Sequence, residues 1–445
     1  MSETKFSINE YLSLKLEDSK TMIYVLGKRF KHCKFLLIKV PVDEISSFDE
    51  LESIDEASER LDKSMEPREG KVYTYKIPSE VEFWGHCSNL QVWYEQDYNT
   101  KLLHSNLAFP LLEALAKAGD AQAQKIFKEE IAERYNNGGE STRTFLRNMK
   151  YLDYLSIEEF LSLIENENER EAITLLRDLH PRFEKRDSRS IVLIDNLDIR
   201  KGKVKKLCLK GLELKNIPEI VKDLNSLESI DLTYNNLESL PDWIGELKEL
   251  KELKIMDNFL KELPETIGEL KSLEKMLARN NKLTYLPESI GNLKNLRVLE
   301  LYQNNLENLP ESIGSLLNLK KIDLHKNKIS NIPNQIGNLK NLKQLIVDEN
   351  QLTNLPESIE NLLELESLIL GSNDLRKLPI SIKRLKKLKR LDVSNNVYFQ
   401  IPEFVYNLPK LEYFFVRDLY LSESQIKKAK ERFKKFINKD IKIFF

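Results

Sequence analysis

The chain has 445 residues, with 69 Lys and Arg against 71 Asp and Glu, so its formal net charge is −2. This near balance argues against a protein that is drawn as a whole to nucleic acid or to an anionic membrane. Hydrophobic residues make up 41% and charged residues 31%, which is typical of a folded chain rather than a disordered one. Three cysteines in so long a chain exclude a disulfide scaffold and favour a reducing compartment.

The beginning of the sequence lacks the basic segment and apolar run of a secretory signal. No stretch approaches the 18 or so apolar residues that a transmembrane helix needs. We therefore expect a soluble protein in the cytoplasm.

Residues 1–45 predict a small β-meander. Leu12, Leu14 and Leu16 alternate along one segment, and strand-forming residues occur at 21–26 and 30–40 after turn residues. Residues 46–78 read as an acidic helix or linker, because the stretch 46–69 holds nine acidic and three basic residues.

Residues 79–189 show helical spacing and predict an all-α domain of about five helices. Gly119 interrupts one long helical stretch, and the turn residues at 136–139 separate the next pair of helices. Residues 190–203 are expected to cap the N-terminal edge of a repeat array, with an edge strand at 190–195.

Residues 204–421 repeat with a period of 23. The template is L-x-x-L-x-L-x-x-N-x-L-x-x-L-P-x-x-I-G-x-L-x-x, in nine full copies and one partial copy that starts at Leu411. Nine of the fifteen prolines lie at one unbroken 23-residue spacing, from Pro218 to Pro402. This period is typical of leucine-rich repeats, which cannot bury their apolar face singly and therefore stack.

The residue type at each recurring template position can be explained physically. The leucines at positions 1, 4 and 6 predict a short strand whose inward face is buried, with neighbouring strands paired in parallel. The asparagine at position 9 predicts a ladder of side-chain hydrogen bonds to the turn backbone. The proline at position 15 predicts a helical or 3₁₀ turn on the convex side. The fold expected is thus α+β: a leucine-rich-repeat solenoid shaped as a horseshoe, preceded by the meander and the helical domain.

Residues 422–445 predict an amphipathic helix that closes the end of the array. Apolar residues recur there at helical spacing, and residues 426–445 hold eight basic and two acidic residues. A peripheral membrane anchor is an alternative interpretation of this basic helix.

Positions 3, 5 and 7 of each repeat, together with position 8, point outward onto the concave face. Apolar, aromatic and arginine side chains at these positions are typical of protein interfaces, and the mixture of charges argues against a nucleic-acid partner. The residues selected as a protein-binding site are Tyr234, Met256, Leu277, Arg279, Val298, Glu300, Tyr302, His325, Ile346 and Ile369.

Catalytic and metal-binding motifs are weak or missing. The sequence has no phosphate-binding G-x-x-x-x-G-K-[ST], no G-x-S-x-G and no H-E-x-x-H. The dipeptides His32-Cys33 and His86-Cys87 suggest zinc, but adjacent residues diverge on a helix or strand, so at most one of each pair could be a ligand. We expect no enzyme activity, no cofactor and no metal; a catalytic N-terminal domain around Trp84, His86 and His104 is the alternative.

Two regions of the chain, the N-terminal part and the repeats, carry a family resemblance. The stretches VEFWGHCSNLQVW (81–93), KLLHSNLAFPLLEALAKAGD (101–120) and NEYLSLKLEDSKTMIYV (9–25) resemble the N-terminal region of archaeal leucine-rich-repeat proteins, especially of the Asgard (Loki-type) lineages. The repeats resemble the 23-residue intracellular class of Ras-interacting scaffold proteins. This resemblance implies a non-catalytic scaffold in signal transduction whose repeats bind a protein partner such as a small GTPase. The oligomeric state stays open.

Overall fold

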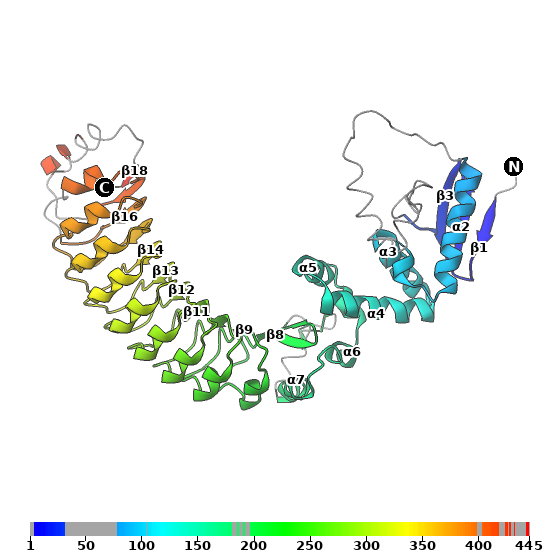
Figure 1. The fold of residues 1–445 in the computed structure, drawn as a ribbon, viewed down its shortest axis with the longest axis horizontal. Helices are drawn as coiled ribbons and strands as arrows, with labels where there is room; N and C mark the ends of the chain where they lie inside the picture. Colours follow the sequence, from blue (N-terminus) through cyan, green and yellow to red (C-terminus); the bar gives the residue numbers. More distant parts are fainter. Residues whose placement is uncertain are drawn as a thin grey trace, which may run out of the picture. The chain divides into compact units, whose positions relative to one another are not determined.

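The structure is a computed structural model that describes residues 4–31, 78–103, 105–179, 185–186, 190–191, 196–397, 403–417, 423–425, 427–428, 431 and 442–444. It divides into two compact units, Met1–Ser156 and Ile157–Phe445, which Figure 1 shows in blue to cyan and in cyan to red. The predicted division between a helical domain and a repeat domain at residue 189 therefore differs from the boundary between the compact units.

The first unit begins with a four-stranded antiparallel sheet in chain order. Its strands are β1 (Lys5–Ser7), β2 (Leu12–Glu17), β3 (Lys20–Val25) and β4 (Lys28–Arg29). Leu12 and Leu14 are fully buried, as the alternation predicts. The strand β1 adds to the predicted meander, whereas most of the strand expected at 30–40 and nearly all of the acidic segment at 46–78 lie outside the described residues.

Helices complete this unit: α2 (Ser79–Glu95), η2 (Thr100–Leu102), α3 (Ser105–Ala118), α4 (Ala121–Asn137), α5 (Glu140–Asn148) and η3 (Tyr151–Tyr154). The breaks at Gly119 and at 136–139 fall where the sequence predicts them. Asp120 caps α4 by accepting the Ala123 N–H at 2.9 Å, and it also accepts the Tyr98 hydroxyl. Tyr98 in turn accepts the side-chain amide of Asn9 at 2.8 Å, so one buried network joins the meander to the helices.

Two of the predicted helices belong to the second unit. These are α6 (Ile157–Leu161) and α7 (Glu167–Leu179). The buried carboxylate of Glu169 accepts the Val204 N–H at 2.9 Å, and α7 packs against the 3₁₀ helix of the first repeat. These contacts make α7 a cap over the start of the array rather than a member of a separate helical domain at 79–189.

The edge strand expected at 190–195 does not join the large sheet in the two of its residues that the structure describes. Its described part, β6 (Ser190–Ile191), pairs with β5 (Lys185–Arg186) in a separate two-stranded sheet. The edge of the large sheet is instead β7 (Leu197–Arg200), which runs antiparallel to β8 (Lys203–Cys208). A hairpin with Gly202 at φ +68° joins β7 to β8, so the chain reverses at the point where the repeats begin.

The repeats form one sheet of twelve strands. Its parallel members after β8 are β9 (Ser229–Asp231), β10 (Glu252–Lys254), β11 (Lys275–Leu277), β12 (Val298–Glu300), β13 (Lys321–Asp323), β14 (Gln344–Ile346), β15 (Ser367–Ile369), β16 (Arg390–Asp392), β17 (Tyr413–Phe415) and β18 (Lys442–Phe444). From β8 to β17 each residue pairs with the residue 23 positions later, as Glu252 does with Lys275. The period in the sequence is thus the register of the sheet.

Each repeat returns through a 3₁₀ helix on the side opposite the strands (Figure 1). These helices are η6 (Glu219–Asp223), η7 (Asp242–Glu246), η8 (Glu265–Glu269), η9 (Glu288–Asn292), η10 (Glu311–Ser315), η11 (Asn334–Asn338), η12 (Glu357–Asn361), η13 (Ile380–Arg384) and η14 (Glu403–Asn407). The repeated proline immediately precedes η6 to η13, where its fixed φ favours the turn. Gly291 lets neighbouring repeats approach closely, because a Cβ there would lie 2.6 Å from the Ser312 carbonyl oxygen.

A buried or half-buried asparagine joins each repeat from the second to the ninth to the one before it. Asn304 donates to the carbonyl oxygens of Ala278 (3.0 Å) and Leu301 (2.9 Å), and its own oxygen accepts the Leu283 N–H (3.1 Å). The same pattern holds for every asparagine of this position from Asn235 to Asn396. The residue before each asparagine has a positive φ, which turns its backbone out of the strand. The predicted ladder is therefore present.

The end of the array departs from the predicted capping helix. Residues 423–425, 427–428 and 431 are helical, but Lys442–Phe444 forms β18, which pairs in parallel with β17. Phe444 stacks on Phe415 with ring centroids 4.5 Å apart. The tail therefore contributes a further strand to the sheet, and the rest of the predicted helix lies outside the described residues.

The asparagine ladder generates the first prediction. Asn304→Ala leaves the buried Leu283 N–H without a partner, and an unsatisfied buried group costs about 1–3 kcal/mol. It also removes one of the two asparagine hydrogen bonds that each of the Ala278 and Leu301 carbonyl oxygens accepts. We expect a loss of about 2–3 kcal/mol in the free energy of unfolding, measured by urea denaturation. Asn305→Ala is the matched control, since its side chain makes no hydrogen bond to the described residues. Equal stability of the two variants would contradict this role of the ladder.

Candidate functional site

The outward side chains of the repeat strands form a surface that we call the strand face, made of template positions 3, 5 and 7. On β12 the inward Leu299 and the next inward residue, Leu301, are fully buried, whereas Val298, Glu300 and Tyr302 are partly exposed. Because the register is constant, outward side chains of successive repeats lie in rows across the strands. All ten residues selected from the sequence lie on this face or, for Tyr234, beside it.

One group of selected residues makes direct contacts across three repeats. Arg279 donates to the Tyr302 hydroxyl at 2.6 Å, and its Nε lies 3.2 Å from the Met256 sulfur. Its guanidinium also lies 5.6 Å from the centre of the Tyr302 ring. With the half-exposed Leu277 and Val298 these side chains form a surface that we call the arginine–tyrosine patch. Interfaces concentrate binding energy in residues of these types.

Tyr234 borders the patch. Its backbone N–H donates to the Met256 carbonyl oxygen at 3.1 Å, and its side chain is 53% exposed. The Lys210 ammonium lies 5.1 Å from the centre of its ring. Tyr234 has a φ of +57°, which is uncommon for an aromatic residue and directs the ring away from the strand.

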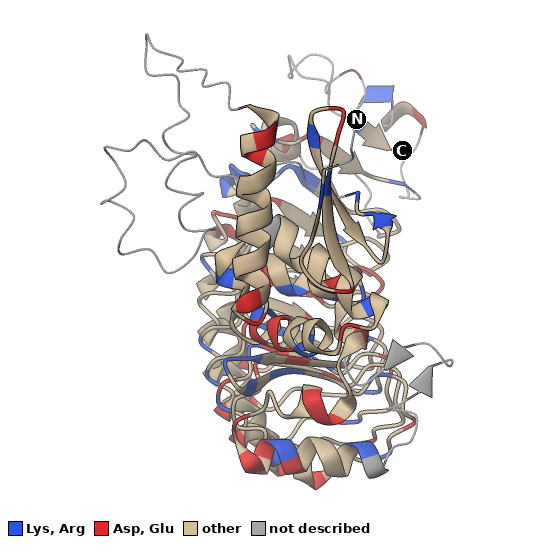
Figure 2. Cartoon of the chain, turned by 90° about the vertical axis from the view of Figure 1, so that its right-hand side faces the viewer, with Lys and Arg blue, Asp and Glu red and all other residues tan. Residues whose placement is uncertain are grey.

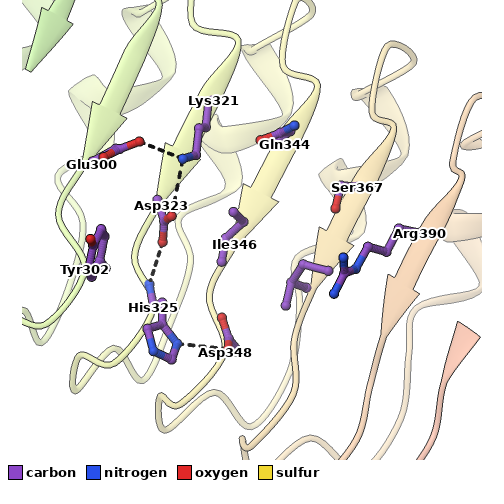
Figure 3. A pocket seen from close by; sticks show the side chains of 11 residues that line it. Glu300, Tyr302, Lys321, Asp323, His325, Gln344, Ile346, Asp348, Ser367 and Arg390 are labelled. Carbon is purple, nitrogen blue, oxygen red and sulfur yellow. Dashed lines mark hydrogen bonds and ion pairs between the residues drawn. The ribbon is translucent and has the colours of Figure 1, made fainter. Parts of the chain in front are cut away.

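A second region of the strand face is hollowed. The hollow has a volume of about 610 Å³ and is lined by β12 to β16 and the residues that come directly after them (Figure 3). It contains five of the selected residues, namely Glu300, Tyr302, His325, Ile346 and Ile369. Tyr302 therefore belongs to the edge of both regions, which makes the patch and the hollow continuous.

Charged side chains dominate one end of the hollow. The Lys321 ammonium lies 2.7 Å from Glu300 and 3.6 Å from Asp323, and His325 Nδ1 lies 2.9 Å from Asp348. Burial is the main cause that raises the pKa of both aspartates above the ordinary value of 3.8. One carboxylate oxygen of Asp348 is buried without a hydrogen-bond partner among the described residues. The ionised aspartates thus cost stability at neutral pH.

Sequence reasoning missed part of this region. Lys321, Asp323, Asp348 and Arg390 line the hollow but are not among the ten selected residues. The selection rests on apolar, aromatic and arginine content, while the signal that would find the other four is a concentration of charges on successive outward positions.

Charges of both signs occur along the array, as Figure 2 shows. Glu228, for example, pairs with Lys205 at 3.0 Å and with Lys251 at 2.9 Å, so a carboxylate of one repeat lies between ammonium groups of the two neighbouring repeats. Mixed charge of this kind lacks the basic stripe of a nucleic-acid-binding surface.

The alternative sites are less well supported. Cys87 is buried, and burial raises the pKa of its thiol to about 11, which disfavours the reactive thiolate. Burial also lowers the pKa of His86, whose Nδ1 has no hydrogen-bond partner in the described part of the chain. Among the described residues no three metal-ligating side chains cluster, and no helix is long and apolar enough to cross a membrane. His32, Cys33 and His104 lie outside the described residues.

Comparison with known families identifies the repeats. A leucine-rich-repeat model matches residues 225–283, and a model of a leucine-rich-repeat region matches residues 277–349. Residues 225–349 are leucine-rich repeats. Proteins built of leucine-rich repeats generally serve as non-catalytic modules for protein–protein interaction. No curated protein matches the sequence.

Several solved structures are similar. A plant peptide hormone receptor, RGFR1 in complex with RGF2, has 34% identity over 46% of this chain and 34% of its own, with a TM-score of 0.44. The Arabidopsis receptor kinase HAESA, in complex with the peptide hormone IDA and the co-receptor SERK1, has 25% identity over 56% of this chain and 46% of its own, with a TM-score of 0.49. The functional domain of InlJ from Listeria monocytogenes has 21% identity over 59% of this chain and 52% of its own, with a TM-score of 0.45. The chain thus spans about a third to a half of the length of these proteins.

The buried aspartate of the hollow generates a prediction for stability. A carboxyl group with a raised pKa favours the folded state when protonated and disfavours it when ionised. Asp348→Asn should therefore raise the melting temperature at pH 7, and the gain should vanish below about pH 3, where the carboxyl is protonated in both states. Differential scanning calorimetry at the two pH values checks this, with the exposed Glu311→Gln as a control. A lower melting temperature of Asp348→Asn at pH 7 would show that the His325 pair outweighs the cost of burial.

Proposed function

We propose that the protein is a non-catalytic interaction scaffold whose leucine-rich repeats bind a protein partner on the strand face. The observation that carries the proposal is the arginine–tyrosine patch: Arg279 contacts both Met256 and Tyr302, and the half-exposed Leu277 and Val298 flank these side chains. Apolar and aromatic surface that is left exposed on a regular sheet is typical of a binding site.

The surrounding structure supports this role. The asparagine ladder and the constant register hold the patch on adjacent strands, so little conformational entropy is lost when a partner binds. The hydrogen bond from Arg279 fixes the Tyr302 ring in place before binding. The ten strands from β8 to β17, at a spacing of about 4.8 Å, give a surface roughly 45 Å long, which suits a folded partner as well as a peptide.

The partner class and the compartment are inferred from resemblance and composition. The 23-residue period resembles that of Ras-interacting repeats, so a small GTPase or another signalling regulator is the first class of partner to test. The three cysteines and the free thiol of the buried Cys87 support a reducing compartment such as the cytoplasm.

Affinity capture with crosslinking tests the proposal. Leu277→Asp places a charge in the patch, and Tyr302→Ala removes an aromatic anchor whose loss costs about 2 kcal/mol or more at a hot spot. We expect each variant to lower the affinity for the captured partner about 30-fold or more. The matched control is Leu317→Asp, since Leu317 is also exposed but lies beyond η10, away from the strand face. An unchanged set of captured proteins in both patch variants would exclude the patch as the site.

A further inference from the structure

The two ends of the hollow carry opposite charge. At one end three carboxylates, Glu300, Asp323 and Asp348, pair with only one ammonium and one imidazole. Lys321 is shared between two of these carboxylates, so this end keeps an excess of negative charge at neutral pH. Such an excess attracts a cationic side chain from outside.

The other end is basic and aromatic. The Arg390 guanidinium is exposed and lies 4.8 Å from the centre of the Phe415 ring, and that of Arg417 lies 5.6 Å from the Phe444 ring. Neither arginine side chain forms an ion pair with the described residues. The nearby Asp392 accepts the Ser394 N–H at 3.0 Å and thereby holds the local backbone. The two guanidinium groups are thus positioned by aromatic rings and lack a carboxylate partner from the described chain.

Apolar side chains lie between the two ends. Ile346 and Ile369 are directly opposite each other on β14 and β15, and both are partly exposed. In Figure 3 Ile346 lies between Asp323 and Arg390. An aliphatic side chain of a ligand would bury apolar surface at this point. Burial stabilises the complex by about 25 cal/mol for each Å² of apolar surface removed from water.

Strand spacing sets the length of a fitting ligand. Asp323 lies on β13 and Arg390 on β16, which are three strand intervals apart, or about 14 Å at about 4.8 Å each. An extended peptide rises about 3.3 Å per residue, so four residues cover about 13 Å. Side chains i, i+2 and i+4 of such a peptide point to the same side. The three regions of the hollow therefore match three alternate residues of one extended segment.

We infer that the hollow binds an extended segment of a partner protein with a basic residue at i, an aliphatic residue at i+2 and an acidic residue at i+4. The basic side chain pairs with Asp348 and Asp323, the aliphatic one packs on the isoleucines, and the carboxylate pairs with Arg390. Charge-assisted hydrogen bonds to a guanidinium are among the stronger ones, so the acidic residue also fixes the direction of the segment. This inference rests on the proposed function, because it specifies what the same face recognises.

Selection from a phage-displayed library of random heptapeptides on the immobilised full chain tests the inference. We expect the wild type to enrich the pattern basic–x–aliphatic–x–acidic about tenfold or more over the input. Arg390→Glu should replace the acidic preference at i+4 by a basic one, and Arg390→Gln should abolish that preference without reversing it. Asp348→Asn should weaken the basic preference at i about tenfold.

The matched control is Arg384→Glu, since Arg384 is exposed on η13 and pairs with Glu360 away from the strand face. It should leave the enriched peptides unchanged, and melting curves check that every variant is folded. Three outcomes would overturn the inference. They are enrichment of peptides without the charged pattern, no enrichment at all, and enrichment of the same peptides by the wild type and Arg390→Glu. If Leu277→Asp and Tyr302→Ala nevertheless lose the captured partner, the proposed function still holds and only the inference about the hollow fails. The failure of the inference is thereby distinguished from a failure of the proposed function.

Discussion

The array depends on one asparagine in each of the eight repeats that hold Asn235 to Asn396. Its side chain satisfies backbone groups in its own turn and in the preceding repeat, as Asn304 does for Leu301, Ala278 and Leu283. Apolar burial supplies most of the driving force, but it does not specify how one repeat is aligned on the next. The directional hydrogen bonds of the asparagine fix that alignment. The constant register, and with it the spacing of every side chain on the strand face, depends on them.

The repeat period explains why so much of the array is predictable. A residue type that returns every 23 positions reveals its role, and so the strands, the 3₁₀ turns and the ladder can all be expected from the sequence. Elements that occur once give no such signal. The strand β18 pairs with β17 across 29 residues rather than 23, and its basic, apolar sequence equally suits a helix. Likewise the role of Glu169 depends on a contact 35 residues away, which local patterns do not contain.

The candidate site is predictable in position and only partly in chemistry. Alternation along each strand identifies the outward residues, and the structure brings Arg279 into contact with both Met256 and Tyr302. The hollow is harder to foresee, because its character depends on how deeply Asp323 and Asp348 are buried and on which carboxylates share Lys321. Burial that makes an ionised carboxylate costly is a common feature of functional sites, where stability is given up for binding.

The strand face, and not the opposite side of the repeats, is the surface that we propose contacts the partner. Site-specific photo-crosslinking tests this most directly, with a photoreactive amino acid placed at position 298 on β12, at position 346 on β14 or at position 317 beyond η10. We predict crosslinks to the captured partner from positions 298 and 346 and none from position 317. Crosslinks from position 317 alone would contradict the proposed binding face.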